Sequence, residues 1–491
     1  MPPTIEQQGD ALYNIFLEAR PAPNRIRDIS YFGAKQGVGY YAVNDLAWQA
    51  AMQWAAQFSG PSYGALITFN GYYEISQPIT LLGDNVLIGG AGLWTGDGGS
   101  GHPGISTLKL LDSTQIAFQL GTHTGINLNG FTLLGSNGTN LNHMGIQGGN
   151  GRNIKIKDVD VHSFGGPGIQ STGGINWDLQ RVEIDGCLKG YLVGNGGGPL
   201  ASYLGALDLT STENFIENCN INGPVGFGVT GQFGSGFACA LNQVGSQSSI
   251  LRSTFAAAQT GIRYVGILNR LLMSRPEGNQ GYGILLDGVQ CSKNYIKACH
   301  FNANSQDSNG GYPAIKVNNA SQNSIKGNWI GGVGVSNLCN YFVDDNTGVG
   351  DNDGAGNEYD DNIGTAYTIT RYHFTNPNNT QKIVSPRPRW QALTDGATVT
   401  PDAQQGDNWQ LIEGGSHTIA APNNSFRGQR VLLAIKNNTA GAITTTFNAA
   451  YKLAGAWVDP GPGKCRCIEF SCYDGTNYIE VSRSAADITA F

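Results

Sequence analysis

A degenerate pattern of apolar positions recurs from about residue 126 to residue 364. Each copy contains an aliphatic residue, a small or apolar residue three positions later, and a further apolar residue two positions beyond. An Asn or a Ser often precedes the first aliphatic residue by two positions, and a Gly followed by an apolar residue comes after most copies. The copies occupy residues 128–133, 156–161, 179–184, 216–221, 250–255, 296–301 and 325–330.

These copies predict a repeating β structure. They begin 23 to 46 residues apart, and a repeat of this length predicts a solenoid, in which each unit buries its apolar face only against its neighbours. Alternating apolar positions are typical of strands, and Gly suits the corners between them. We therefore expect an all-β chain built on a right-handed parallel β-helix, with its Asn side chains stacked as a hydrogen-bonded ladder. The longer steps are expected to carry loops, the longest of them between residues 255 and 296.

The chain before the repeat is predicted to form an arm and a cap. Residues 1–25 are polar and contain proline, as an N-terminal arm would. Residues 44–58 predict an Ala-rich amphipathic helix that has Asn44 as its N-cap residue and ends before Gly60. A helix at this place would cover the open end of the solenoid, where strands would otherwise lack partners. Residues 26–84 are thus the predicted cap with the first strands, and residues 85–364 are the predicted β-helix.

Two segments that flank this helix resemble a known family. They read Tyr-Phe-Gly-Ala-Lys over 31–35 and Ile-Thr-Phe-Asn-Gly-Tyr-Tyr-Glu-Ile-Ser-Gln-Pro-Ile over 67–79. Together they resemble the N-terminal part of the pectate-lyase-superfamily (rhamnogalacturonase/epimerase-like) β-helix proteins, which include polysaccharide-degrading enzymes and phage tailspike depolymerases. The resemblance covers about residues 26–364, and it implies the β-helix, a polysaccharide substrate and, for a tailspike-like chain, a homotrimer. Asn44 replaces the first Asp of a usual pair, and Asn70 replaces a common Pro.

After Gly364 the repeat fades, and the pattern predicts a second domain. Residues 365–390 end in the run Pro-Arg-Pro-Arg-Trp and form the predicted linker. Residues 391–491 contain short alternating runs separated by Gly, Asn and Asp, which are typical of antiparallel strands. Asp474 and Gly475 between two such runs predict a β-hairpin. We therefore expect a C-terminal antiparallel β-sandwich.

Stacking the copies in register places outward side chains in columns, because neighbouring coils lie about 4.8 Å apart. Residues two apart on one strand and residues on adjacent coils then form one patch of acidic side chains. Crowded carboxylates raise one another's pKa, so that one becomes an acid and another remains a base. A solvated face whose charges are offset by nearby cations is the structural alternative. The candidate catalytic residues for glycoside hydrolysis are Asp160, Glu183, Asp185 and His162.

A second group of polar residues lies in and near the predicted long loops, where binding and catalysis are often found. Arg263 and Tyr264 suggest a lyase, in which the Arg neutralises a uronate carboxylate while Tyr264 or His300 removes a proton. Aromatics such as Trp329 are suited to stacking on sugar rings. The alternative is that these residues only hold loops in place. The candidate substrate-binding residues are Asp208, Glu217, Arg263, Tyr264, Glu277, Asp287, His300 and Trp329.

Composition limits the kinds of ligand that the chain is expected to bind and the places where the protein is expected to be found. The net charge is −7 and only 13% of the residues are charged, which argues against nucleic acid as a ligand. No apolar run is long enough for membrane insertion, and no signal peptide is visible at the N-terminus. We expect an extracellular or virion-associated protein. The nine cysteines are spread widely, so buried thiols are expected in place of a disulfide framework.

One segment suggests a metal ligand. Asp351, Asp353 and Glu358 lie in a stretch that is rich in oxygen ligands at a spacing suited to Ca²⁺, although it departs from the EF-hand pattern. An Asx-rich turn is the alternative. No other cofactor is expected.

The leading hypothesis from the sequence is an enzyme that cleaves a polysaccharide by acid/base glycoside hydrolysis, in a groove on or between β-helices. A polysaccharide lyase or an intramolecular glycosyltransferase that forms cyclic products is the second hypothesis. The third is a non-catalytic carbohydrate-binding or virion attachment protein. In a trimer, acidic residues of two subunits would share the site.

Overall fold

The computed structural model describes residues 25–60, 64–91, 106–188, 204–223, 238–305, 311–331, 339–346, 357–360, 362–364, 367–374, 382–384, 390–403, 407–423, 425 and 428–489. The chain divides into two compact units. The first comprises Met1–Ala320, Gly327–Val343 and Asn362–Thr370, and the second comprises Ser321–Lys326, Asp344–Asp361 and Arg371–Phe491.

The first unit is a parallel β-helix, as the repeat predicts, and each regular coil contributes three strands. The first strand series contains β2 (Ala65–Phe69), β5 (Val86–Gly90), β12 (Ile175–Gln180), β15 (Phe215–Glu217), β18 (Ser249–Leu251), β21 (Arg270–Leu272) and β24 (Tyr295–Lys297). The second contains β3 (Gly71–Ile75), β6 (Ser106–Leu110), β13 (Glu183–Asp185), β16 (Asn220–Asn222), β19 (Thr254–Ala256), β22 (Arg275–Glu277), β25 (His300–Asn302), β28 (Trp329–Gly331) and β31 (Ile363–Gly364). The long strands β8 (Asn127–Leu134) and β10 (Arg152–His162) run through both series.

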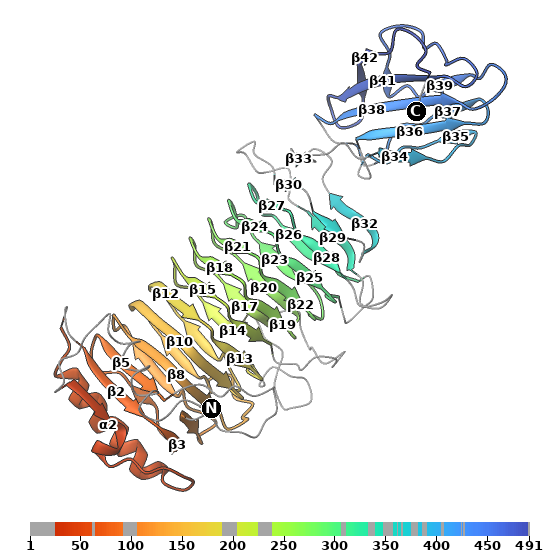
Figure 1. Cartoon of the computed structure of the whole chain (residues 1–491). Helices are drawn as coiled ribbons and strands as arrows, with labels where there is room; N and C mark the ends of the chain where they lie inside the picture. The colour runs from red at the N-terminus through yellow and green to blue at the C-terminus, as the bar shows by residue number, and fades with distance from the viewer. Residues whose placement is uncertain are drawn as a thin grey trace. The chain divides into compact units, whose positions relative to one another are not determined.

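The third strand series forms a separate parallel sheet on the β-helix. It contains β4 (Ile79–Thr80), β7 (Phe118–Gly121), β9 (Ile146–Gly148), β11 (Ile169–Ser171), β14 (Leu204–Leu209), β17 (Ala238–Gln243), β20 (Thr260–Tyr264), β23 (Ile284–Asp287) and β26 (Ile315–Asn318). Two further strands of this sheet are β29 (Cys339–Asp345) and β32 (Tyr367–Phe374). Each begins with residues of the first unit and ends with residues of the second. Figure 1 shows the strands of the first unit stacked in order from β2 onward.

The apolar positions of the repeat form the interior of the β-helix. In the first series one register position is Leu or Ile in every coil from β8 to β24, and each of these side chains is at most 1% exposed. Full burial of such a side chain stabilises the fold by about 2 kcal/mol. These inward residues are Leu128, Ile156, Leu179, Ile216, Ile250, Leu271 and Ile296.

The prediction of a long loop between residues 255 and 296 is wrong. This stretch contains a complete further coil, whose strands β21 and β22 pair with β18 and β19 in parallel register. Its apolar positions are Leu271 and Pro276, and both side chains are buried. Pro is unusual inside a strand because it has no N–H to donate, which hides the coil from a search for aliphatic repeats.

Most corners between the first and second series are formed by non-glycine residues, contrary to the expectation of Gly, although Gly130 and Gly327 occupy two of them. Asp158, Arg181, Asn218, Arg252 and Met273 have φ values of 52°, 50°, 52°, 47° and 50°. A left-handed conformation costs such residues on the order of 1–3 kcal/mol. Hydrogen bonds between coils offset part of this cost, since the N–H groups of Arg181, Asn218 and Arg252 each donate to a carbonyl of the next coil at 3.0–3.2 Å.

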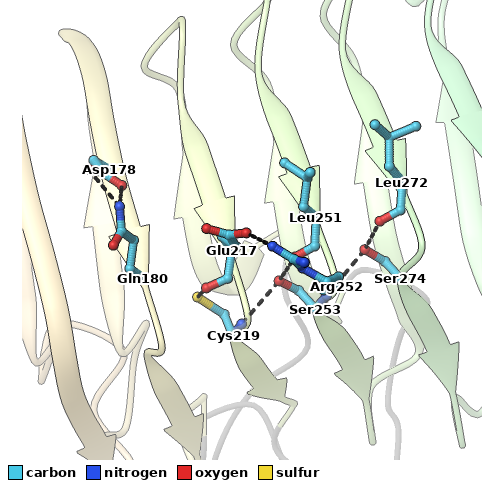
Figure 2. A network of polar contacts seen from close by, with 9 residues as sticks. All are labelled: Asp178, Gln180, Glu217, Cys219, Leu251, Arg252, Ser253, Leu272 and Ser274. Carbon is cyan, nitrogen blue, oxygen red and sulfur yellow. Dashed lines mark hydrogen bonds and ion pairs between the residues drawn. The ribbon is translucent and has the colours of Figure 1, made fainter.

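Polar side chains stack inside the coil as two ladders. The predicted ladder is confirmed: the backbone N–H of Asn214 donates to Ser248 Oγ, and that of Ser248 donates to Asn269 Oδ1. A second ladder runs parallel to it, with the N–H of Cys219 donating to Ser253 Oγ at 3.1 Å (Figure 2). Each ladder satisfies buried N–H groups that the coil corners leave without a strand partner. The cysteines are free thiols, and all but Cys467 are buried.

The N-terminal helix covers one end of this interior. The chain first forms β1 (Ile26–Asp28) and the 3₁₀ helix η3 (Ile29–Phe32). The N-terminal helix α2 (Tyr41–Ala56) follows them. Trp48 of α2 packs edge-on against Phe69 and Phe118. The predicted N-cap role of Asn44 is wrong, because Asn44 is buried inside α2. Its side-chain amide bonds the backbone of Lys35 and the carbonyl of Glu74.

Within the second unit, β27 (Ser324–Lys326), β30 (Glu358–Asp360) and β33 (Lys382–Val384) pair in parallel. The C-terminal part contains two sheets. One comprises β34 (Trp390–Leu393), β36 (Asn408–Glu413), β38 (Arg430–Asn437), β41 (Cys465–Cys472), β42 (Tyr478–Arg483) and β40 (Tyr451–Lys452). The other comprises β35 (Thr398–Val399), β37 (His417–Ile419) and β39 (Thr445–Phe447).

The pairing in these two sheets is mixed, not wholly antiparallel as the prediction had it. β34, β36 and β38 are parallel, and so are β35, β37 and β39, because the chain alternates between the sheets at each strand. The antiparallel pairs are β38–β41 and β41–β42, and the latter is the hairpin predicted at Asp474 and Gly475. The core between them includes Trp409, Phe470 and Tyr478.

Candidate functional site

Outward side chains of the second strand series form two columns, as the repeat register predicts. The first column contains Thr132, Asp160, Glu183, Asn220, Thr254 and Arg275, followed by His300 and Trp329. The second column contains Leu134, His162 and Asp185, followed by Asn222, Ala256, Glu277, Asn302 and Gly331. The coil missed from the sequence adds Arg275 and Glu277 to these columns.

The acidic end of the columns lies on β10 and β13. Asp160 and Glu183 are direct register partners, as are His162 and Asp185. Asp160 is only 4% exposed, and burial is the main cause that raises its pKa to about 7, with the negative charges of Glu183 and Asp158 adding to the effect. The ring of His162 faces Asp185, whose Oδ2 lies 4.0 Å from Nδ1.

Asp160 is therefore partly protonated at neutral pH, while Asp185 on the neighbouring coil is half exposed. The Oγ1 of Thr132, one coil before Asp160, is buried and has no hydrogen-bond partner among the described residues. A protonated carboxyl beside a second carboxylate is an arrangement that transfers protons near neutral pH.

The other end of the columns is aromatic. Trp329 is 45% exposed, and its ring lies against that of His300, with centroids 4.0 Å apart. Burial, and then the charge of Arg275, lower the pKa of His300. Arg275 forms an ion pair of 2.8 Å with Glu277 across the two columns. This end thus presents an exposed aromatic ring beside a neutral imidazole and a paired charge.

Three predicted binding residues lie elsewhere, on the third strand series. Asp208 accepts hydrogen bonds from Asn242 and Gln170, and burial raises its pKa. Arg263 binds Asp287 at 2.8 Å. These contacts form a polar row on β14, β20 and β23, so the structure does not bring Asp208, Arg263 and Asp287 to the two columns.

The proposed lyase pair of Arg263 and Tyr264 is wrong in its geometry. Adjacent strand residues point to opposite faces, and Tyr264 is 1% exposed in the interior of the β-helix. Its hydroxyl has no partner among the described residues, and burial raises its pKa well above the ordinary value. A base at this position would not reach a substrate held by Arg263.

Glu217 also lies outside the columns, on β15 of the first series, where it forms an ion pair with Arg252 (Figure 2). Of the calcium candidates, Asp351 and Asp353 fall outside the described residues. Glu358 pairs with Lys326 at 2.6 Å. Across the described part of the chain, no group of three His, Cys, Asp or Glu side chains is placed to hold a metal ion. The helices in that part are too short or too polar to cross a bilayer.

No family model matches this chain, and a search of curated proteins gives no match. Similar solved structures include the mannuronan C-5 epimerase A-module of Azotobacter vinelandii (16% identity, TM-score 0.46, 74% of this chain and 100% of that one). They also include the Dettilon tailspike protein (12%, 0.49, 94% and 80%) and the surface adhesin PfbA of Streptococcus pneumoniae (14%, 0.41, 94% and 98%). At these values the similarity assigns no function, and the β-helix is established by its own parallel strand pairs.

Proposed function

We propose that this protein hydrolyses a polysaccharide at the acidic end of the two columns. The observation that carries the proposal is the buried Asp160, whose pKa is raised to about 7 beside the register partner Glu183. A carboxyl held partly protonated at neutral pH serves as a general acid toward a glycosidic oxygen. The resemblance of the cap supports the choice of a polysaccharide.

In this mechanism Asp160 donates its proton to the glycosidic oxygen, and Asp185 accepts a proton from the attacking water. Asp185 lies one coil and two residues away from Asp160, which places the two Cα atoms about 8 Å apart. Backbones at this separation can carry carboxyl groups about 6.5–9.5 Å apart, a distance that is typical of inverting enzymes. Burial, and then the charge of Glu183, keep Asp160 protonated, and His162 orients Asp185 through their contact.

The test is a polysaccharide panel in which new reducing ends and the ultraviolet absorbance of unsaturated uronates are measured on each sample. Hydrolysis predicts reducing ends without absorbance. Asp160→Asn and Asp185→Asn are each expected to lower turnover by about 10²–10⁴-fold. Asp178→Asn is the matched control, because Asp178 lies on β12 of the adjacent series and binds Lys155 and Gln180. Turnover that survives Asp160→Asn, or absorbance that rises with reducing ends, would refute the proposal.

A non-catalytic attachment protein is the second candidate, favoured by the exposed Trp329 at the other end of the columns. It predicts that the unmutated chain binds one polymer and leaves its length unchanged. Transfer within the substrate would differ from hydrolysis by releasing cyclic sugars without new reducing ends. For either candidate we propose an extracellular or virion-associated homotrimer, which the tailspike-like cap implies and which sedimentation of the full chain would test.

A further inference from the structure

The two columns carry hydrogen-bonding groups along their whole length but little positive charge. Between the acidic end and Trp329, four of the eight outward residues carry an amide or a hydroxyl, and the other four are Ala256, Arg275, Glu277 and His300. An Arg or Lys free to bind is what recognition of a carboxylate or sulfate requires. The neutral polar members of this stretch are Asn220, Asn222, Thr254 and Asn302.

The single guanidinium of this stretch is already paired. Arg275 binds Glu277 at 2.8 Å on the same strand, so the pair presents no net charge. Lys109 precedes Leu134 in the second column, on the far side of the acidic end from Trp329.

Negative charge dominates at the acidic end, where Glu183 and Asp185 lie on adjacent positions of the two columns. A polyanionic chain laid across these residues would be repelled. The electrostatics of the columns therefore oppose a uronate or sulfated polymer, and the amide and hydroxyl groups suit sugar hydroxyls.

The aromatic end is built to hold a flat ring. Gly331 follows Trp329 by two residues and therefore points to the same face. A Cβ atom at Gly331 would overlap the six-membered ring of Trp329, so the indole lies across the backbone at this glycine. His300 supports the indole from the previous coil, and the Nε2 of His300 is buried without a hydrogen-bond partner among the described residues. The exposed remainder of the indole is a platform for the apolar face of a sugar ring.

Six coil steps separate Asp160 from Trp329, which corresponds to about 29 Å. We infer that the ligand of this face is an uncharged polysaccharide, bound along the two columns with one sugar stacked on Trp329. The inference rests on the proposed polysaccharide function, but it concerns the binding of the polymer and not its cleavage. It predicts that a ligand too short to span the columns gains nothing from Trp329.

Binding of the full chain to immobilised polymers tests the inference independently of turnover. Dextran, pullulan and galactomannan serve as uncharged probes, alginate and polygalacturonate as anionic probes, and chitosan as a cationic one. We expect one uncharged polymer to bind, with affinity that changes less than about twofold between 50 and 500 mM NaCl because no ion pairs form. Tighter binding of an anionic probe or of chitosan, lost at high salt, would overturn the inference.

Variants at the platform complete the test. Trp329→Ala is expected to weaken binding by about 10- to 30-fold, Trp329→Phe to retain most of it, and Gly331→Ala to weaken it by displacing the indole. Trp390→Ala is the control, because Trp390 is 50% exposed but belongs to β34 in the second unit. Equal affinity of Trp329→Ala and the parent would overturn the inference even if hydrolysis is observed. Binding that depends on Trp329 without any turnover would leave it standing and refute the proposed hydrolysis.

Discussion

Replacing Asp160 with Asn is expected to stabilise the first unit at alkaline pH while it removes activity. Asp160 is buried at 4% exposure, and burial with the charges of Glu183 and Asp158 raises its pKa from 3.8 to about 7. The folded state therefore holds a proton that the unfolded chain releases at lower pH. A difference of about 3 pKa units corresponds to about 4 kcal/mol.

Because the pKa of Asp160 is higher in the folded state than in the unfolded chain, its contribution to stability falls as the pH rises. The contribution of Asp160 to stability is fully present below about pH 4 and is lost as the pH rises through about 7. An Asn at this position has the same shape and carries no charge at any pH. Compared with the parent, Asp160→Asn should gain up to about 4 kcal/mol between pH 4 and pH 8.

Thermal unfolding of the full chain at several pH values measures this difference. For a unit of this size about 1–2 °C is expected per kcal/mol, so the midpoint of Asp160→Asn should exceed that of the parent by about 5 °C at pH 8 and coincide with it near pH 4. Asp178→Asn is the control, since Asp178 forms hydrogen bonds to Gln180 on the adjacent series. A difference that does not change with pH would refute the buried-acid account, and a gain in stability without loss of turnover would remove Asp160 from catalysis.

Three further predictions concern other buried groups. Glu413 is fully buried against His417, and burial raises its pKa to about 8, so Glu413→Gln should stabilise the second unit as the pH rises from 5 to 9, in the same unfolding assay. Asn269→Ala should destabilise the first unit by about 1–3 kcal/mol, because the N–H of Ser248 loses its acceptor, and denaturant midpoints would show it. Tyr264→Phe should raise stability by up to about 1 kcal/mol and leave any activity unchanged; loss of turnover would favour a lyase in which Tyr264 is the base.

The fold was predictable because its determinants are local. An apolar residue at a fixed register position in each coil, such as Ile156 or Ile250, must be buried by the same position of the next coil, and spacing alone reveals this. The Asn and Ser ladder was visible for the same reason. The coil at residues 271–276 was hidden because Pro276 occupies an inward strand position, where an aliphatic residue is expected.

The face on which each site residue lies was predictable from the sequence, but the burial of each side chain was not. Strand alternation correctly placed Asp160 and Glu183 in one outward column, since period two decides which face a side chain takes. Strand alternation likewise puts Arg263 and Tyr264 on opposite faces, because they are adjacent in sequence. Asp160 is nonetheless only 4% exposed. No spacing rule indicates such burial, and the raised pKa follows from it.

Asp160 at one end of the columns is buried, whereas Trp329 at the other end is exposed. This contrast limits how one ligand could contact both residues. A proton donor gains from burial because a low dielectric keeps Asp160 protonated, whereas Trp329 must stay exposed to contact a sugar. On a globular surface such requirements compete within one cleft. On a β-helix they are separated by whole coils, so their distance changes only in steps of about 4.8 Å. One coil added between β13 and β28 would shift the platform by one such step, while the local contacts of Asp160 and of Trp329 would stay as they are. The length of polymer that spans both ends is therefore set by the number of coils.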